Sequence, residues 1–534
     1  MNRWRPVLIM LLSAFVWLGS SFAYGATPDV IVASRHDTSP PFAQLAGATS
    51  KISGGSNKQA PTARPTHAPL SSSQTDSVAG TFAGPLSDVS TGVNFEGQSA
   101  DDTRNLLGLA FVPPDTNGAV GAKQFVQMVN VTISVYGKSG KLQLGPELIH
   151  TLWTGFGGLC EFGGGAPDFT DGGDPIVLYD HLAKRWLVSQ LQYDSTFTHN
   201  AECVAISTSP DATGSYHRYQ FDFSPLFPDY PKFAVWPDAY YNSVNVFSGN
   251  SFVGADACAL DRNAMLQGAS ASMICFPQPP SVSSLLPSDL DGSTLPPSGS
   301  PNYFIGLADT TDVNLFQFHV DFANPGNSIF SGTQVPVAAY SEICARAITL
   351  ACIPEPPPGE KLDGLGDRVM FRLAYRNFGD HESLVVNHTV AGGPLAAVRW
   401  YEIRSPGAVP FVYQQETLYD PNINFWLGSV AMDRNGDMAL GFSASSRSLF
   451  PSIYVAGRQS TDAVDTMSGP LIVITGTGAQ FHSFNRWGDY SSMSIDPTDD
   501  CTFWYTNEYY QTTSSFNWHT HVQSFKFNSC KPGP

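Results

Sequence analysis

The segment Asp174-Pro-Ile-Val-Leu-Tyr179 places a small polar residue at a turn directly before a run of apolar residues. Two further strand-like runs follow it, Arg185-Trp-Leu-Val-Ser-Gln190 and Cys203-Val-Ala-Ile-Ser-Thr208. Short runs with two-residue alternation, separated by Gly, Asp, Asn or Pro, are typical of antiparallel strands joined by tight turns. This segment therefore predicts one small antiparallel sheet.

The same phrase recurs along the chain at steps of 59 to 65 residues. Its starting positions are Asp115, Asp174, Asp238, Asn302, Asp367, Ser429 and Asp489. Repeats of this kind are typical of a β-propeller, because one four-stranded blade cannot bury both of its faces without neighbours. We therefore predict an all-β protein, a β-propeller of seven blades with about 62 residues each. Six blades are the alternative, with the repeat at Asn302 as an insertion.

The first 100 residues differ in composition from the rest. Two positive charges in Met1–Arg5 precede an apolar run from Val7 to Leu18 and then small residues, which predicts a signal peptide over residues 1–26. Residues 27–100 are rich in Ser, Thr, Pro and Gly and predict a disordered spacer or a propeptide. Residues 101–534 are expected to form a single propeller, with a strand near Val93–Gly97 closing the ring. We expect a secreted protein, extracellular or periplasmic, without a membrane span.

Eight cysteines follow the predicted signal peptide, and an even number in an exported chain favours disulfides. Short separations favour pairing Cys258 with Cys275 and Cys344 with Cys352. Cys501 and Cys530 bracket the last repeat, which leaves Cys160 to pair with Cys203.

The net charge is -18 and the pI is about 4.9, which argues against nucleic acid or an anionic membrane as a partner. Only 14% of residues are charged whereas 12% are aromatic, as in many exported all-β proteins. We expect a monomer whose partner is an extracellular polysaccharide or glycoconjugate, or a protein.

Three phrases carry a resemblance to a known group. Pro113-Pro-Asp-Thr-Asn-Gly-Ala-Val-Gly121, Val398-Arg-Trp-Tyr-Glu-Ile-Arg404 and Asn485-Arg-Trp-Gly-Asp-Tyr-Ser-Ser-Met-Ser-Ile-Asp496 resemble those of secreted bacterial proteins of propeller type. The resemblance covers roughly residues 105 to 530 and implies fold and location. More distantly, the layout is similar to sialidase-like propellers, whose glycan sites lie over the central channel. The chain departs from that pattern, since it has no Ser-x-Asp-x-Gly-x-Thr-Trp runs and no assignable arginine triad.

In a propeller, a polar residue at the start of each innermost strand places one side chain per blade around a common channel mouth. Asp174, Asp238, Asp367 and Asp489 are therefore candidate catalytic carboxylates. Carboxylates, guanidinium groups and aromatic faces suit sugar recognition. The ligand-binding candidates are Asp115, Trp236, Arg368, Trp426, Arg486, Trp487 and Tyr490. The alternatives are that the aspartates cap turns, that the tryptophans wedge blades together, and that the arginines form ion pairs between blades.

The loop Asp433-Arg-Asn-Gly-Asp437 has spacing suited to calcium, with Asp433, Asn435 and Asp437 as ligands. The alternative is a hairpin turn between two strands. Calcium is the one cofactor that we consider. The sequence contains no Gly-x-Ser-x-Gly elbow, HExxH motif or phosphate-binding loop, which argues against a lipase, a zinc protease or a nucleotide enzyme.

Three functions fit these patterns. The first is a propeller that binds an extracellular glycan or protein at the channel mouth. The second is a carbohydrate-active enzyme, a glycoside hydrolase or polysaccharide lyase, that uses two of the ring carboxylates. The third is a structural protein of the cell envelope. Fold alone does not separate them.

Overall fold

The computed structural model describes residues 21–23, 27–47, 58–59, 75–162, 171–344, 351–481 and 485–531. Apart from strand β1 (Ser21–Ala23), the predicted signal peptide lies outside these residues.

Antiparallel strands form successive four-stranded units, in which strands that follow each other in the sequence pair with each other. The first and last strands of six units are β8 (Asn117–Val120) and β11 (Leu142–Leu148), β12 (Ile176–Asp180) and β15 (Tyr216–Asp222), β16 (Phe227–Val235) and β19 (Ser272–Pro277), β20 (Leu286–Asp291) and β23 (Ile329–Pro336), β26 (Val369–Asn377) and β29 (Phe411–Leu418), and β30 (Asn424–Met432) and β33 (Ser468–Ile474). The last unit combines β34 (Ser492–Ile495), β35 (Phe503–Tyr510) and β36 (Trp518–Phe527) with β6 (Val89–Ser99).

The middle strands are β9 (Gln124–Val129), β10 (Thr132–Gly137), β13 (Arg185–Tyr193), β14 (Asn200–Ser207), β17 (Tyr240–Ser248), β18 (Ser251–Leu260), β21 (Asn302–Leu307), β22 (Asp312–His319), β27 (Glu382–Gly392), β28 (Leu395–Arg404), β31 (Met438–Ser445) and β32 (Ser452–Arg458). Two short pairs lie outside the units, β4 (Lys58–Gln59) with β7 (Phe111–Val112) and β24 (Ala351–Ile353) with β25 (Leu362–Asp363).

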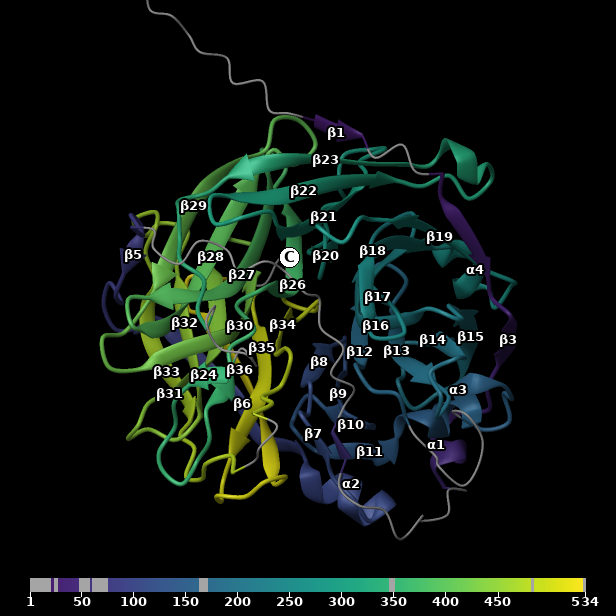
Figure 1. Ribbon diagram of the computed structural model, residues 1–534, viewed down its shortest axis with the longest axis horizontal. Coiled ribbons are helices and arrows are strands. Elements are labelled where there is room, and N and C mark those ends of the chain that lie inside the picture. The colour runs from purple at the N-terminus through teal and green to yellow at the C-terminus, as the bar shows by residue number, and fades with distance from the viewer. Residues whose placement is uncertain are drawn as a thin grey trace, which may run out of the picture.

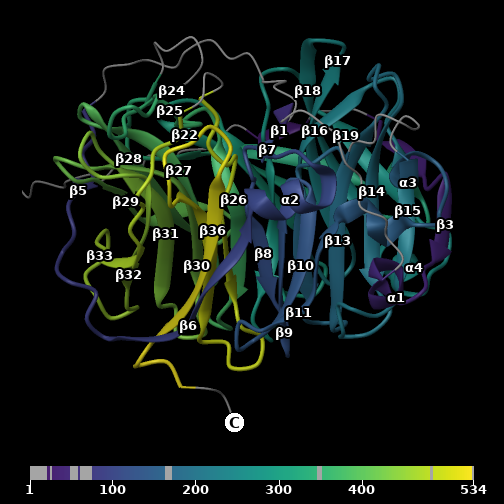
Figure 2. The ribbon, with the colours of Figure 1, turned by 90° about the horizontal axis from the view of Figure 1, so that it is seen from below.

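The sheets are arranged around a central axis, with the first strand of each unit innermost, and the longer strands run along this axis in the perpendicular view (Figures 1 and 2). The protein is thus an all-β propeller, as the repeats predict. We interpret the strand order as seven blades. The fourth and fifth units are also joined by parallel pairing of β20 with β26, at Ser288 and Leu373, which merges them into one ten-stranded sheet.

Apolar side chains fill the spaces between adjacent sheets. Val126 and Met128 of β9 share a buried cluster with Trp186 and Val188 of β13. Val455 of β32 similarly shares one with residues of β35. Each sheet therefore buries its faces against its neighbours, which is the stacking that makes the repeat stable.

The ring closes as expected, because β6 pairs antiparallel with β36 and places Phe95 opposite Val522. Other parts of the predicted spacer also belong to the propeller. Strands β2 (Asp29–Val32) and β3 (Arg35–Thr38) extend the sheets at β19 and β15, and β5 (Ala79–Gly80) pairs parallel with β29. Figure 2 shows the chain between β5 and β6 passing along the outer rim. Composition pointed to a spacer here because edge strands attach through main-chain hydrogen bonds and need few apolar side chains.

The predicted repeat is out of register at three positions. Asp238 lies in the turn after β16, Asn302 begins β21, and Ser429 lies inside β30. At Asp238 the physical reason is that the turn between the first and second strands has the same polar character as the turn before the first strand. The residue that stands near the start of β16 is instead Asp229.

Short helices and disulfides complete the structure. The helices are α1 (Phe42–Ala46), α2 (Ala100–Leu107), α3 (Leu159–Phe162) and α4 (Arg262–Leu266), with 3-10 turns at Ile149–Trp153 and Pro325–Asn327. The disulfides are Cys160–Cys203, Cys258–Cys275, Cys344–Cys352 and Cys501–Cys530, the pairs that the spacing favours. Within the described residues, no helix is long and apolar enough to cross a membrane.

Candidate functional site at the channel mouth

A cluster of charged and tyrosine side chains lies where the innermost strands begin. We call it the mouth cluster, and it consists of Asp115, Asp174, Asp229, Tyr230, Lys232, Asp367, Arg368, Arg486, Asp489 and Tyr490. These residues come from the units that begin with β8, β12, β16, β26 and β34. The innermost strands all start at the same end of the channel, so positions far apart in the sequence meet there.

Asp115 connects the first unit to the last and, through Asn130, to the second. Its carboxylate accepts a hydrogen bond from the Asp489 backbone N–H at 2.7 Å and one from Asn130 Nδ2 at 2.7 Å. Asn130 Oδ1 accepts from the Asp174 backbone N–H at 2.9 Å, and Asp174 Oδ2 accepts from the Tyr230 N–H at 3.1 Å. These carboxyl groups therefore fix the backbone turns that begin four units, as the turn-capping alternative expects.

The Asp115 and Asp174 carboxyl groups also hold a proton between them. Burial raises the pKa of Asp115 well above its usual value, and the negative charges of Asp489 and Asp174 raise it further. Burial likewise raises the pKa of Asp174, while the Lys232 ammonium and a hydrogen bond from Asp115 act in the opposite direction. Two carboxyl groups this close do not both ionise readily, so the pair favours a state with one shared proton.

The cations of the mouth cluster are buried against aromatic rings. Lys232 Nζ lies 3.4 Å from the ring centroid of Tyr230 and 4.1 Å from that of Tyr490, and donates to the Pro231 carbonyl at 2.9 Å. Burial lowers the pKa of Lys232 to about 8. Cation–π contacts of this kind stabilise an ammonium group that is removed from water.

Both arginines form ion pairs with carboxylates that the sequence had singled out. Arg368 binds Asp367 through two hydrogen bonds of 2.9 and 3.0 Å, and Arg486 donates to Asp489 at 2.8 Å. The Arg368 guanidinium also lies 4.7 Å from the Tyr230 ring centroid. Two-point binding orients a guanidinium group and its carboxylate partner.

Three polar groups in the mouth cluster remain without a partner among the described residues. No hydrogen bond to the Asp229 carboxyl is found there, and Tyr230 Oη and Arg486 Nε are buried without an acceptor or donor. Burial raises the pKa of Asp229 well above its usual value, and the nearby Asp174 and Asp489 carboxylates add to this. Polar groups left unpaired in a buried position are those that a ligand or water would satisfy.

The sequence prediction missed Asp229, Tyr230 and Lys232. The signal was present in Phe227-Pro-Asp-Tyr-Pro-Lys-Phe233, where Asp229 follows Asp174 by 55 residues and precedes an apolar run. The turn at Asp238 was preferred because it kept the repeat more even.

The structure places Asp238 and the three candidate tryptophans outside the mouth cluster. Asp238 follows the far end of β16, where the Tyr241 hydroxyl lies 3.4 Å from its carboxylate. The Trp236 ring centroid lies 4.7 Å from that of Tyr375 in a core cluster between sheets.

Trp426 and Trp487 are also buried, with ring centroids 5.9 Å apart, and Trp487 Nε1 donates to Ser443 Oγ at 3.1 Å. Buried in this way, none of the three tryptophans presents a ring face to a ligand.

Asp433, Asn435 and Asp437 form the hairpin turn between β30 and β31. Asp433 Oδ1 accepts from the N–H groups of Asn435 and Asp437 at 2.8 and 3.1 Å, while Asp437 accepts from the Ser460 N–H and the Ser529 hydroxyl. Across the described ranges, no group of three or more His, Cys, Asp or Glu side chains is arranged to hold a metal ion. The hydrogen bonds match the hairpin alternative.

Comparisons with known proteins show limited similarity. No model of a protein family matches the sequence, and no curated protein matches it. Trypanosoma rangeli sialidase is 11% identical, with a TM-score of 0.30, over 65% of this chain and 54% of its own, so that the match spans about half of the sialidase.

Two arabinofuranosidases are similar to the same degree. The α-L-arabinofuranosidase of Lactobacillus brevis is 11% identical over 67% of this chain and 92% of its own, with a TM-score of 0.29. That of Fusarium graminearum is 7% identical over 83% and 99%, with a TM-score of 0.33. At these TM-scores we draw nothing from the comparisons about activity.

Proposed function

We propose that this protein is secreted and binds an extracellular glycan at the channel mouth. The observation that carries the proposal is the unpaired state of the Asp229 carboxyl, Tyr230 Oη and Arg486 Nε within one cluster. A carboxyl, a phenol and a guanidinium group together offer donors and acceptors suited to sugar hydroxyls. The ion pairs of Arg368 and Arg486 and the Asp115 hydrogen bonds would hold these groups in place before the ligand arrives.

A polysaccharide screen tests this proposal. The purified protein would be titrated with a panel of neutral and acidic polysaccharides, and the best ligand would then be titrated into Tyr230→Phe. Losing one ligand hydrogen bond should weaken binding about three- to tenfold. Tyr303→Phe is the matched control, since Tyr303 Oη is also buried without a partner but its ring packs against Trp236 between sheets. Equal affinity of wild type and Tyr230→Phe would contradict the proposal.

A second candidate function is cleavage of the bound glycan, and the proton state of Asp229 favours it. A carboxyl whose pKa is raised by burial stays protonated near neutral pH and can act as a general acid towards a leaving oxygen. Asp489 is the candidate for the opposing carboxylate, because its ion pair with Arg486 favours the charged form.

Asp229→Asn separates cleavage from binding. The amide keeps the shape of the side chain but cannot supply the proton, so binding should persist while product release falls about 100-fold or more. Asp433→Asn makes the same change in another buried aspartate with a raised pKa, located in the β30–β31 hairpin, and should leave product release unchanged. Binding without products in the wild type would leave recognition as the sole function.

A further inference from the structure

The far end of the channel contains a second polar cavity, which is separated from the mouth cluster. Its volume is about 320 Å³, and it is lined by the ends of β8, β12 and β20, by part of β26 and by the loop after β34. Phe371 lines this cavity and packs against Tyr490 of the mouth cluster, with ring centroids 6.3 Å apart. Tyr490 in turn packs against Tyr230, at 6.1 Å. These rings form a layer between the two ends, so the cavity is not an extension of the mouth.

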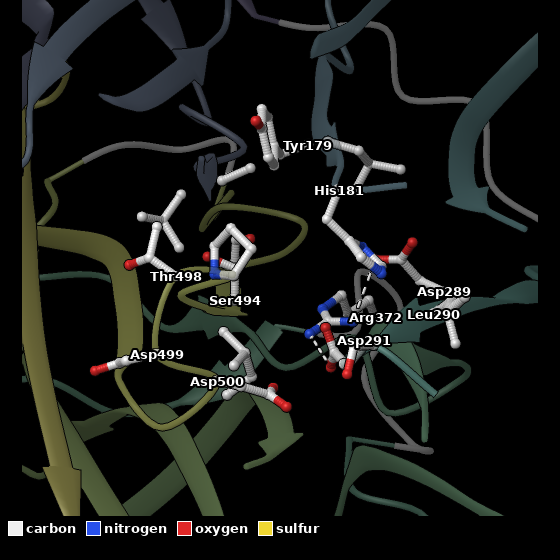
Figure 3. Close-up of a pocket in the computed structure, with 18 of the residues that line it drawn as sticks. Tyr179, His181, Asp289, Leu290, Asp291, Arg372, Ser494, Thr498, Asp499 and Asp500 are labelled. Atoms are coloured by element: carbon white, nitrogen blue, oxygen red, sulfur yellow. Dashed lines mark hydrogen bonds and ion pairs between the residues drawn. The ribbon is translucent and has the colours of Figure 1, made fainter. Parts of the chain in front are cut away.

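Three side chains bring buried polar atoms without hydrogen-bond partners to this cavity. They are Tyr179 Oη, His181 Nε2 and Ser494 Oγ, and the Tyr179 hydroxyl has the Ala122 main chain beside it. Figure 3 shows the three on different sides of the cavity. Buried polar atoms normally have partners, so three unpaired atoms around one cavity indicate a space that a polar molecule fills.

The charged groups of the cavity are already paired, which limits the ligand. Arg372 donates to Asp289 at 3.2 Å, to Asp291 at 2.6 Å and to the Met493 carbonyl at 3.1 Å (Figure 3). Asp500 is bound by Arg376 at 2.7 Å. Burial lowers the pKa of His181, although nearby Asp291 and Asp180 oppose this, so its ring is neutral at pH 7. The groups left for a ligand are therefore two hydroxyls and a neutral imidazole, while the surrounding carboxylates disfavour anions.

The cavity opens to solvent and continues into a larger one. Ser293, Pro497 and Thr498 are exposed at its rim. These three residues, together with Tyr179 and His181, also line an adjoining cavity of about 780 Å³. A molecule held by Tyr179 and His181 could thus extend outward along this second space. The inner volume lies in the range of small-molecule sites, which is about 300 to 1,000 Å³.

We infer that the far cavity is a second ligand site, which takes a neutral, hydroxyl-rich unit such as one residue of a neutral saccharide. Tyr179 Oη, His181 Nε2 and Ser494 Oγ would hydrogen-bond its hydroxyl groups, and the Tyr179 ring would offer an apolar face. This site does not depend on the function proposed for the mouth.

Ligand-observed NMR with glucose, galactose, arabinose and glucuronate tests the inference on the whole protein. At least one neutral sugar should bind, and glucuronate should bind more weakly. Tyr179→Phe and Ser494→Ala should each weaken binding about three- to tenfold. Because both changes remove hydroxyls without partners, the melting temperature should not fall.

Tyr303→Phe and Ser134→Ala are the matched controls, since each also removes a buried hydroxyl without a partner but neither lines the cavity. Equal affinity of Tyr179→Phe, Ser494→Ala and wild type would overturn the inference. Absence of binding by every neutral sugar would also overturn it, and would leave water as the occupant. Weakening by Tyr230→Phe alone would assign the sugar to the mouth instead, so the two proposals fail separately.

Discussion

The Asp489 backbone N–H donates a hydrogen bond to the Asp115 carboxylate across 2.7 Å, and so joins the last unit of the propeller to the first. The pairing of β6 with β36 closes the same ring at its outer edge. Asp115 is fully buried and also belongs to the mouth cluster. Ring closure and the candidate ligand site therefore share one side chain.

Asp115→Ala should destabilise the fold. It leaves the Asp489 N–H and Asn130 Nδ2 buried without their acceptor, and each unpaired group costs about 1 to 3 kcal/mol. We expect a decrease of about 2 to 5 kcal/mol in the free energy of unfolding, measured by urea denaturation. Asp115→Asn keeps one acceptor oxygen and should lose less. Equal stability of wild type and Asp115→Ala would show that water replaces the carboxylate.

Asp367→Asn should destabilise the protein by about 3 to 5 kcal/mol, because it removes the carboxylate that pairs with the buried Arg368 guanidinium. Adding Arg368→Met should recover part of this loss, since the uncompensated charge is then absent. The measurement is a double-mutant cycle from chemical denaturation. If the double variant were less stable than Asp367→Asn by the full effect of Arg368→Met, the pair would not be coupled.

Trp236→Ala should act on stability alone. The side chain is fully buried between sheets, so the expected loss is about 3 to 5 kcal/mol, as for other buried aromatic residues. Under conditions where the variant is still folded, its affinity for the mouth ligand should match that of the wild type. A selective loss of affinity without a loss of stability would return Trp236 to the ligand-binding candidates.

Asp433→Asn should change how stability depends on pH. Burial raises the pKa of Asp433 to about 8, and the Asp437 carboxylate adds to this, whereas the pKa in the unfolded chain is about 3.9. The stability from this group is therefore fully present at low pH and is lost as the pH rises towards 8.

The amide does not ionise, so the variant should gain stability relative to the wild type between pH 5 and pH 8. Urea denaturation at several pH values measures this difference. A difference that does not vary with pH would contradict the raised pKa.

Much of the mouth cluster could be predicted from the sequence. Asp115, Asp174, Asp367 and Asp489 each stand at a turn before an apolar run, and that local pattern places them at strand starts. Asp229 escaped because two turns of similar composition flank β16, and only the paired strands show which turn comes first. Local pattern therefore identifies turns better than it orders them.

The edge strands and the far cavity show two other limits. Strands β2, β3 and β5 attach through main-chain hydrogen bonds, which composition does not reveal. Tyr179, His181 and Ser494 come from strands more than 300 residues apart in the sequence, and nothing in their local context marks them as neighbours. Such contacts arise only from the closed ring.

The most direct test of the central claim is a crystal structure of the protein with the polysaccharide fragment that binds best in the screen. The account predicts a sugar unit at the channel mouth, within hydrogen-bond reach of Tyr230 Oη and the Asp229 carboxyl. A fragment bound elsewhere on the protein, with water alone at these two groups, would contradict it.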